Sequence, residues 1–187
     1  QGAQKINEAI LQIIEGRLNK NYQIIWATGP KQYDIIKGEL ENKRISIDNI
    51  ENMKIVPYIY NMEEVENISD VIVARSGAMT VTEISNLGKP SILIPLPNVS
   101  NDHQLYNAKV LEDIGAAKII LNKDLTADKL DLKIKNIISY PQSYQQSVYN
   151  QNSNNSNIPQ QVQTIQNTQP IMQNQNVNWV SQKYYIC

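Results

Sequence analysis

The strongest constraint on the fold is an alternation of short apolar runs with stretches of helical periodicity over residues 1–140. Asp70-Val71-Ile72-Val73-Ala74 is typical of the apolar runs, which predict buried strands. Apolar residues at three- and four-residue steps, as at Ile6, Ala9 and Ile13, predict amphipathic helices. Near-continuous apolar strands that alternate with helices indicate a parallel sheet covered on both faces. The pattern therefore predicts a doubly wound α/β, Rossmann-like domain.

The expected elements can be placed by residue number. We expect strands at 22–28, 54–59, 70–74, 91–95 and 117–121, and helices at 6–14, 33–40, 62–67, 80–87, 103–114 and 126–138. Pro57 restricts its strand to a strand end or a sheet edge. The sequence opens on a helix, whereas this architecture normally begins with a strand and a glycine turn. We therefore expect the first strand to be missing, with Gln1-Gly2-Ala3 as the end of its turn.

The charged residues are confined almost entirely to the first 140 positions. The chain has 17 Lys and Arg and 18 Asp and Glu, and Lys183 alone among them follows position 140. Residues 141–187 contain 21 Gln or Asn. Such a polar, nearly uncharged stretch cannot bury enough apolar surface to offset the entropy of ordering it. We expect one folded domain at 1–140 and a disordered, low-complexity tail at 141–187 with no defined role.

Composition argues against several classes of function. A net charge of -1 lacks the basic footprint of a protein that binds nucleic acid or an anionic membrane surface. The single cysteine, Cys187, allows neither a disulfide framework nor a thiolate metal cluster and fits a reducing compartment. No run of about 18 apolar residues provides a membrane anchor, and no signal-peptide pattern opens the chain. A start at Gln1 rather than Met suggests a fragment.

The segment 74–83 is the first candidate for ligand chemistry, because ligands of open parallel sheets bind beyond the carboxyl ends of the strands. Ser76, Gly77 and Ala78 are small and precede a helix, whose free N–H groups and dipole suit a phosphate or diphosphate. Glu83, one turn further, can accept two hydrogen bonds from a ribose. An ordinary capped helix, with Glu83 favouring the helix dipole, explains the pattern equally well.

Three further loops follow strands or open a helix. Asp102, His103 and Gln104 can hydrogen-bond sugar hydroxyls at a helix start, although Asp102 or Asn101 as a simple N-cap is the alternative. Residues 57–62 can present backbone groups to a base edge, but structural packing is the favoured reading there. The Gln1-Gly2-Ala3 turn is a candidate contact to phosphate or acceptor. No Asp-x-Asp pair in a loop, no phosphate-binding P-loop and no nucleophile beside a base is present in the sequence.

Five segments together carry a family resemblance by their order and spacing. They are residues 1–7, 56–62, 74–83, 88–95 and 101–108, and the Arg-Ser-Gly-Ala-Met-Thr and His-Gln stretches are the most specific. The chain resembles the C-terminal half of the peptidoglycan N-acetylglucosaminyltransferases of glycosyltransferase family 28, which have the GT-B fold. The resemblance runs from Gln1 to about Ile138.

The resemblance implies a reaction and a donor site. Its members transfer N-acetylglucosamine from UDP-GlcNAc to lipid I, with inversion and without a metal cofactor, giving lipid II on the cytoplasmic face of the membrane. The implied donor-binding residues are Ile59 for uracil through its backbone, Glu83 for ribose, Ser76, Gly77, Ala78, Met79 and Thr80 for the diphosphate region, and His103 and Gln104 for sugar hydroxyls. His103 stands where some members have Gln.

The resemblance also implies what this chain lacks. The base that activates the acceptor and the contacts to lipid I are expected in an N-terminal domain, so the chain alone should be inactive and carries no catalytic residue. A Gly-Gly-Ser segment normally precedes the position of Gln1. Two alternatives stay open: another GT-B enzyme with a different UDP-sugar, such as a glycolipid synthase, and a non-catalytic nucleotide-sugar-binding remnant.

Overall fold

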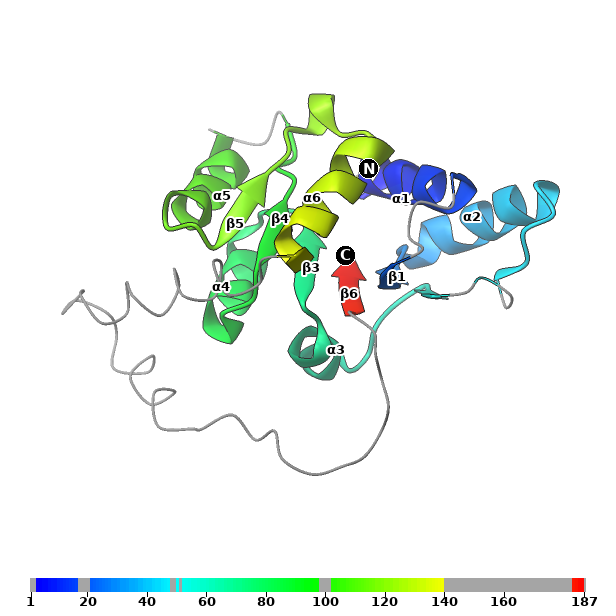
Figure 1. Ribbon diagram of the computed structural model, residues 1–187, viewed down its shortest axis with the longest axis horizontal. Helices are drawn as coiled ribbons and strands as arrows, with labels where there is room; N and C mark the ends of the chain where they lie inside the picture. Colours follow the sequence, from blue (N-terminus) through cyan, green and yellow to red (C-terminus); the bar gives the residue numbers. More distant parts are fainter. Residues whose placement is uncertain are drawn as a thin grey trace.

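The computed structural model describes residues 3–16, 21–47, 50, 52–97, 102–139 and 183–186 (Figure 1). Its helices are α1 (Gln4–Glu15), α2 (Pro30–Asn42), α3 (Met62–Ile68), α4 (Ala78–Leu87), α5 (His103–Asp113) and α6 (Ala127–Ser139), with a 3-10 turn, η3 (Asn122–Asp124). Its strands are β1 (Gln23–Ala27), β2 (Met53–Val56), β3 (Val71–Ala74), β4 (Ser91–Leu93), β5 (Ala117–Ile119) and β6 (Lys183–Ile186). Every helix and strand expected within residues 1–140 is confirmed in type and approximate place.

Within the described residues the strands form one sheet in the order β2-β1-β6-β3-β4-β5, and every pair is parallel. The doubly wound α/β prediction is therefore confirmed. β2 is an edge strand and ends at Val56, directly before Pro57, as expected for a proline that cannot donate to a ladder. All strands point the same way, so their carboxyl ends share one edge of the sheet.

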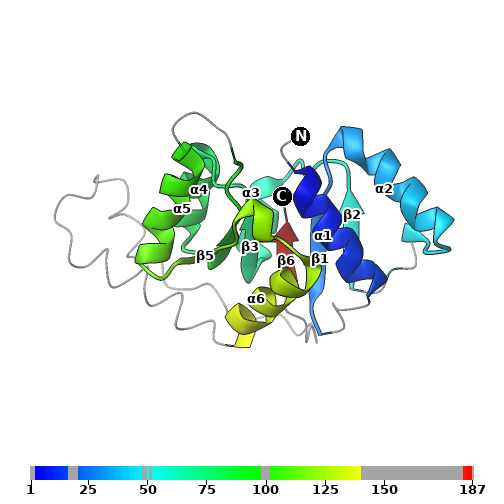
Figure 2. The same ribbon diagram turned by 90° about the horizontal axis from the view of Figure 1, so that it is seen from above.

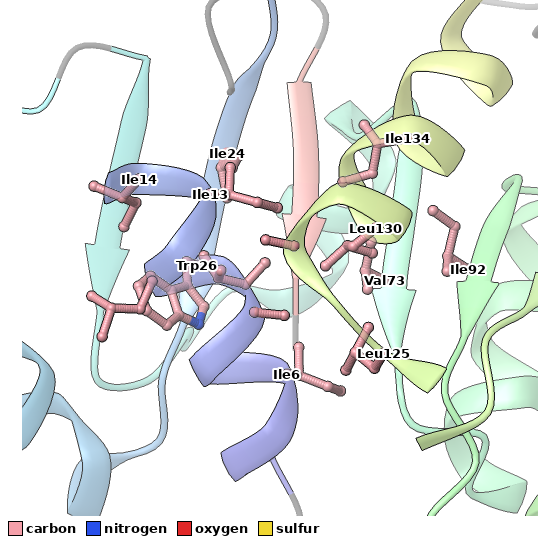
Figure 3. Close-up of a cluster of buried hydrophobic side chains, with 14 of the residues drawn as sticks. Ile6, Ile13, Ile14, Ile24, Trp26, Val73, Ile92, Leu125, Leu130 and Ile134 are labelled. Carbon is pink, nitrogen blue, oxygen red and sulfur yellow. The ribbon is translucent and has the colours of Figure 1, made fainter. Parts of the chain in front are cut away.

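The two faces of the sheet bury two separate clusters, because side chains alternate along each strand. Ile24 and Trp26 of β1 and Val73 of β3 join a cluster with α1, α2 and α6 (Figure 3). The alternate residues of β3, Ile72 and Ala74, join a second cluster with Ile84 of α4 and with residues of α3 and α5. Helices therefore cover both faces, as Figure 2 shows from above.

A buried polar contact fixes α1 against the carboxyl end of β1. Trp26 Nε1 donates to Asn7 Oδ1 at 3.0 Å, and Asn7 Nδ2 donates to the Thr28 carbonyl at 3.0 Å. Asn7 and Trp26 are both buried, so these hydrogen bonds satisfy groups that would be costly to leave unpaired. The contact positions the turn at Thr28-Gly29, where Gly29 adopts a φ of 83° before Pro30 starts α2.

The C-terminal segment differs from the expectation of a disordered tail at 141–187. Lys183–Ile186 forms β6, which lies between β1 and β3. In the doubly wound order 3-2-1-4-5-6 that central position belongs to the first strand. Lys183–Ile186 thus occupies the place that the first strand has in that order. The remainder of 141–187 lies outside the described residues.

No helix within the described ranges has the length and apolar character needed to cross a bilayer.

Candidate functional site at the carboxyl edge of the sheet

The loops that follow β2, β3 and β4 meet at the carboxyl edge of the sheet, where sequence reasoning placed the candidate residues. Ser76 and Gly77 connect β3 to α4, and residues 94–97 are the described part of the chain that follows β4. Because β3 and β4 are neighbours in the sheet, these two segments lie side by side.

Within the described residues, the first backbone N–H groups of α4 have no hydrogen-bond partner. Gly77 is the N-cap in an extended conformation (φ −63°, ψ 154°) and no side chain caps the helix. The first intrahelical bond from this turn runs from Val81 N to Gly77 O at 3.0 Å. The N–H groups of Ala78, Met79 and Thr80 precede that bond and are the free donors that a helix start offers to an anion.

The described residues leave space beside this helix start. A Cβ built onto Gly77 would meet none of their heavy atoms within 4 Å. Met79 is 78% exposed, and Ala78 is exposed as well. An anion can therefore approach the backbone at Gly77 without displacing any described side chain.

Ser76 locks this loop to α5. The Ser76 hydroxyl donates to the Gln104 carbonyl at 2.7 Å, and Asn107 Nδ2 donates to the Ser76 carbonyl at 3.2 Å. Ser76 is fully buried. Its hydroxyl proton is thus used within the protein, and its contribution to a ligand site is to set the path of the backbone into Gly77.

Gln104 is held by one end of its amide. Leu96 N donates to Gln104 Oε1 at 2.9 Å, which ties the start of α5 back to the loop after β4. Among the described residues the Nε2 group has no hydrogen-bond partner, so its two protons remain for a ligand acceptor. The geometry makes Gln104 a donor to sugar hydroxyls or phosphate oxygens rather than an acceptor from them.

Arg75 is a residue whose importance sequence reasoning missed. Its Nη1 group donates to the Ile94 carbonyl at 3.0 Å and to Asn122 Oδ1 at 2.8 Å, so one side chain joins the ends of β3, β4 and β5. Burial lowers the pKa of the Arg75 guanidinium. The available sequence signal was an arginine placed directly after the buried strand β3.

Glu83 is exposed on α4, one turn beyond the free donors. Its carboxylate has an acidic neighbour, Glu66 of α3, which is buried. Burial raises the pKa of the Glu66 carboxyl, and the nearby charges of Glu83 and Glu63 raise it further. The Glu83 carboxylate lies one turn beyond the N-terminus of α4, where it can accept hydrogen bonds from hydroxyl groups and would repel a phosphate.

The loop after β2 combines a buried residue with exposed aromatic rings. Ile59 is only 5% exposed and packs in the same cluster as Ile84, the residue after Glu83. A ligand can therefore meet Ile59 only through its backbone. Tyr58 and Tyr60 flank it, with ring centroids 5.1 Å apart in an edge-on arrangement and Tyr60 92% exposed.

The structure tests whether Asp102 is a simple N-cap at the start of α5. Asp102 is the N-cap position of α5, but its φ is 51° and it makes no side-chain cap hydrogen bond, so simple capping by Asp102 is not observed. His103 is exposed at the first position of α5. Asn101, Gln1 and Gly2 lie outside the described residues.

Over the described ranges, no group of three or more His, Cys, Asp or Glu side chains is placed to hold a metal ion.

The fold is a doubly wound, Rossmann-like α/β domain, and comparison with known proteins gives its family. The chain belongs to glycosyltransferase family 28, because the model of the family's C-terminal domain matches residues 1–173.

The similar proteins are MurG-type enzymes. The chain is 45% identical over 142 residues to a UDP-N-acetylglucosamine--N-acetylmuramyl-(pentapeptide) pyrophosphoryl-undecaprenol N-acetylglucosamine transferase of Thermoanaerobacter sp. (strain X514), covering 76% of this chain and 38% of the relative. The transferase of the same name from Bacillus cytotoxicus is 45% identical over 145 residues, covering 78% of this chain and 39% of the relative. The crystal structure of Acinetobacter baumannii MurG superposes with a TM-score of 0.63 and 28% identity over 79% of this chain and 41% of MurG. The chain thus spans about two fifths of the length of these relatives.

Proposed function

We propose that the chain is the donor-binding part of an inverting glycosyltransferase that moves N-acetylglucosamine from UDP-GlcNAc to lipid I, giving lipid II in peptidoglycan synthesis. The observation that carries the proposal is the uncapped start of α4 beside open space at Gly77, with Glu83 one turn beyond. Membership of family 28 and the names of the relatives supply the ligand.

The chemistry follows from where charge develops. When the glycosidic bond to UDP breaks, negative charge grows on the diphosphate while the sugar becomes oxocarbenium-like. The free N–H groups of Ala78, Met79 and Thr80 and the dipole of α4 stabilise the leaving charge without reorganising. Arg75 and Ser76 hold the loop in place before the donor arrives, so the cost of ordering it is met in folding.

In this proposal, each of the other parts of UDP-GlcNAc contacts a particular residue. The uracil rests on the Ile59 backbone, and Glu83 accepts hydrogen bonds from the ribose hydroxyls. His103 and the Nε2 group of Gln104 contact the sugar. The base for the acceptor hydroxyl and the lipid I site belong to the other part of a full-length enzyme, which works at the cytoplasmic face of the membrane. The chain alone should bind the donor without turnover.

Calorimetric titration of UDP-GlcNAc into the chain tests the site. Glu83→Ala should weaken binding about 10-fold or more, since a carboxylate hydrogen bond contributes on the order of 1.5–3 kcal/mol. Glu39→Ala, which removes an exposed carboxylate from α2, is the matched control and should leave the affinity unchanged. Equal affinity of Glu83→Ala and the unaltered chain would remove Glu83 from the site.

The same titration identifies the donor. UDP-GlcNAc should compete better than UDP-glucose or UDP-galactose. A preference for either of the latter would favour a GT-B glycolipid synthase, and binding of none of the three would favour a remnant without donor function.

A further inference from the structure

The middle of the sheet is completed by a segment that is remote in sequence from both of its neighbours. Lys183–Ile186 pairs in parallel with Gln23–Trp26 of β1 on one side and with Val71–Val73 of β3 on the other (Figures 1 and 2). In the sheet order β1 and β3 are not neighbours. Without β6, the sheet would consist of a β2-β1 part and a β3-β4-β5 part, each with an open edge facing the other.

The two parts of the sheet are also held together by contacts that do not involve β6. α1 packs on α6, and one buried cluster contains Ile24 from β1 together with Val73 from β3 and Ile92 from β4. Side chains of these elements lie on the same face of the sheet in Figure 3. The helices therefore keep the two open edges at a separation that an extended strand can bridge with backbone hydrogen bonds.

We propose that the space between β1 and β3 is a strand-binding groove, and that Lys183–Ile186 is its tethered and exchangeable occupant. The segment binds by adding a parallel strand between two existing edges, so that the backbone supplies most of the recognition. Residues 140–182 connect it covalently to α6. The inference concerns the sheet alone and is independent of the proposed donor site.

The tether determines how the occupant competes. A covalent tether holds its ligand at a fixed effective concentration that does not depend on how dilute the chain is. A free copy of the same segment must exceed that concentration to displace it from an unaltered chain, whereas it should bind readily when the tethered copy is disabled.

The test uses the full chain with Tyr185→Pro, because proline in a central strand cannot donate its ladder hydrogen bond. Gln166→Pro, which places proline outside β6, is the matched control. A fluorescent peptide with the sequence of residues 179–186 should bind Tyr185→Pro with 1:1 stoichiometry and at least 10-fold more tightly than it binds the unaltered chain or Gln166→Pro. The same peptide with proline at the position of Tyr185 should not bind.

Hydrogen exchange gives a second, local measurement. Tyr185→Pro should lose amide protection in β1 and β3 but not in β5, and added peptide should restore it. Equal peptide affinity for Tyr185→Pro and Gln166→Pro, or unchanged protection in β1 and β3, would overturn the proposal. Global unfolding of Tyr185→Pro that the peptide does not reverse would also overturn it, because β6 would then be an inseparable part of the fold.

Discussion

The loop between β3 and α4 and the loop between β2 and α3 both lie at the carboxyl edge of the sheet, but they are held in different ways. Side-chain hydrogen bonds from Arg75, Ser76 and Asn107 tie the first loop to its neighbours. The second buries Ile59 and leaves Tyr58 and Tyr60 exposed. The difference indicates that side-chain hydrogen bonds fix the backbone of the loop after β3 during folding, whereas the loop after β2 exposes two aromatic rings.

The largest effect is expected from Arg75→Ala. Loss of the guanidinium leaves the Ile94 carbonyl and Asn122 without their partner, and a hydrogen bond to a charged group contributes about 1.5–3 kcal/mol. The free energy of unfolding, measured with urea, should fall by roughly that amount, and UDP-GlcNAc affinity should fall with it. Lys109→Ala, an exposed change on α5, is the control. A variant as stable as the control would show that the loop after β3 does not depend on the Arg75 hydrogen bonds.

Gly77→Val separates folding from binding. The backbone of Gly77 is in a region open to any residue, and its Cβ position faces empty space, so thermal stability should change little. The added side chain occupies the approach to the free donors of α4, and donor affinity should fall about 10-fold or more, which corresponds to about 1.4 kcal/mol. Calorimetry and thermal unfolding of the same sample check both parts. Unchanged affinity would place the anion elsewhere.

Asn107→Ala should have an intermediate effect. It removes the hydrogen bond to the Ser76 carbonyl, which is worth about 1 kcal/mol for a neutral pair. Chemical denaturation should report that loss of stability, together with a smaller loss of donor affinity. An effect as large as that of Arg75→Ala would mean that the hydrogen bonds of Arg75, Ser76 and Asn107 stabilise the loop as one cooperative unit.

Glu66→Gln should produce a small, pH-dependent gain in stability. The pKa of Glu66 is raised in the folded protein, so the native state holds a proton that the unfolded state releases at lower pH. The ionised carboxyl therefore costs stability above its folded pKa, and the cost disappears as the pH falls below about 4.5, the ordinary value. Thermal unfolding should show the gain of Glu66→Gln at pH 7 and none at pH 4. A gain that does not vary with pH would come from packing instead.

The smallest effect is expected from Tyr60→Ala. The ring is almost fully exposed and its described ring contact is the edge-on pair with Tyr58, so the free energy of unfolding should change by less than about 1 kcal/mol. Urea unfolding checks this value. A larger loss would show that the exposed loop is also held by its side chains, and the contrast between the two loops would fail.

The candidate site was only partly predictable from the sequence. Small residues before a helix at Ser76 and Gly77 predicted a turn into a helix start that can bind an anion. The structure shows the turn and a helix start without a side-chain cap, and anion binding there stays a prediction. The sequence could not show that the Ser76 hydroxyl is turned towards Gln104, because that bond joins residues brought together by the pairing of β3 with β4. Arg75 was overlooked for the same reason, since its partners lie after two other strands.

The sequence by itself determined the helices and strands of the first 140 residues, because hydrophobic periodicity is a local property that burial on one or two faces imposes. The sequence also shows that the charged residues, apart from Lys183, end near position 140, where the alternation of apolar strands and helices ends. Only the tertiary structure decided which segment fills the middle of the sheet. Strand pairing is a long-range choice made by backbone groups that every residue carries, so four residues of a tail without periodic pattern could take the central place between β1 and β3.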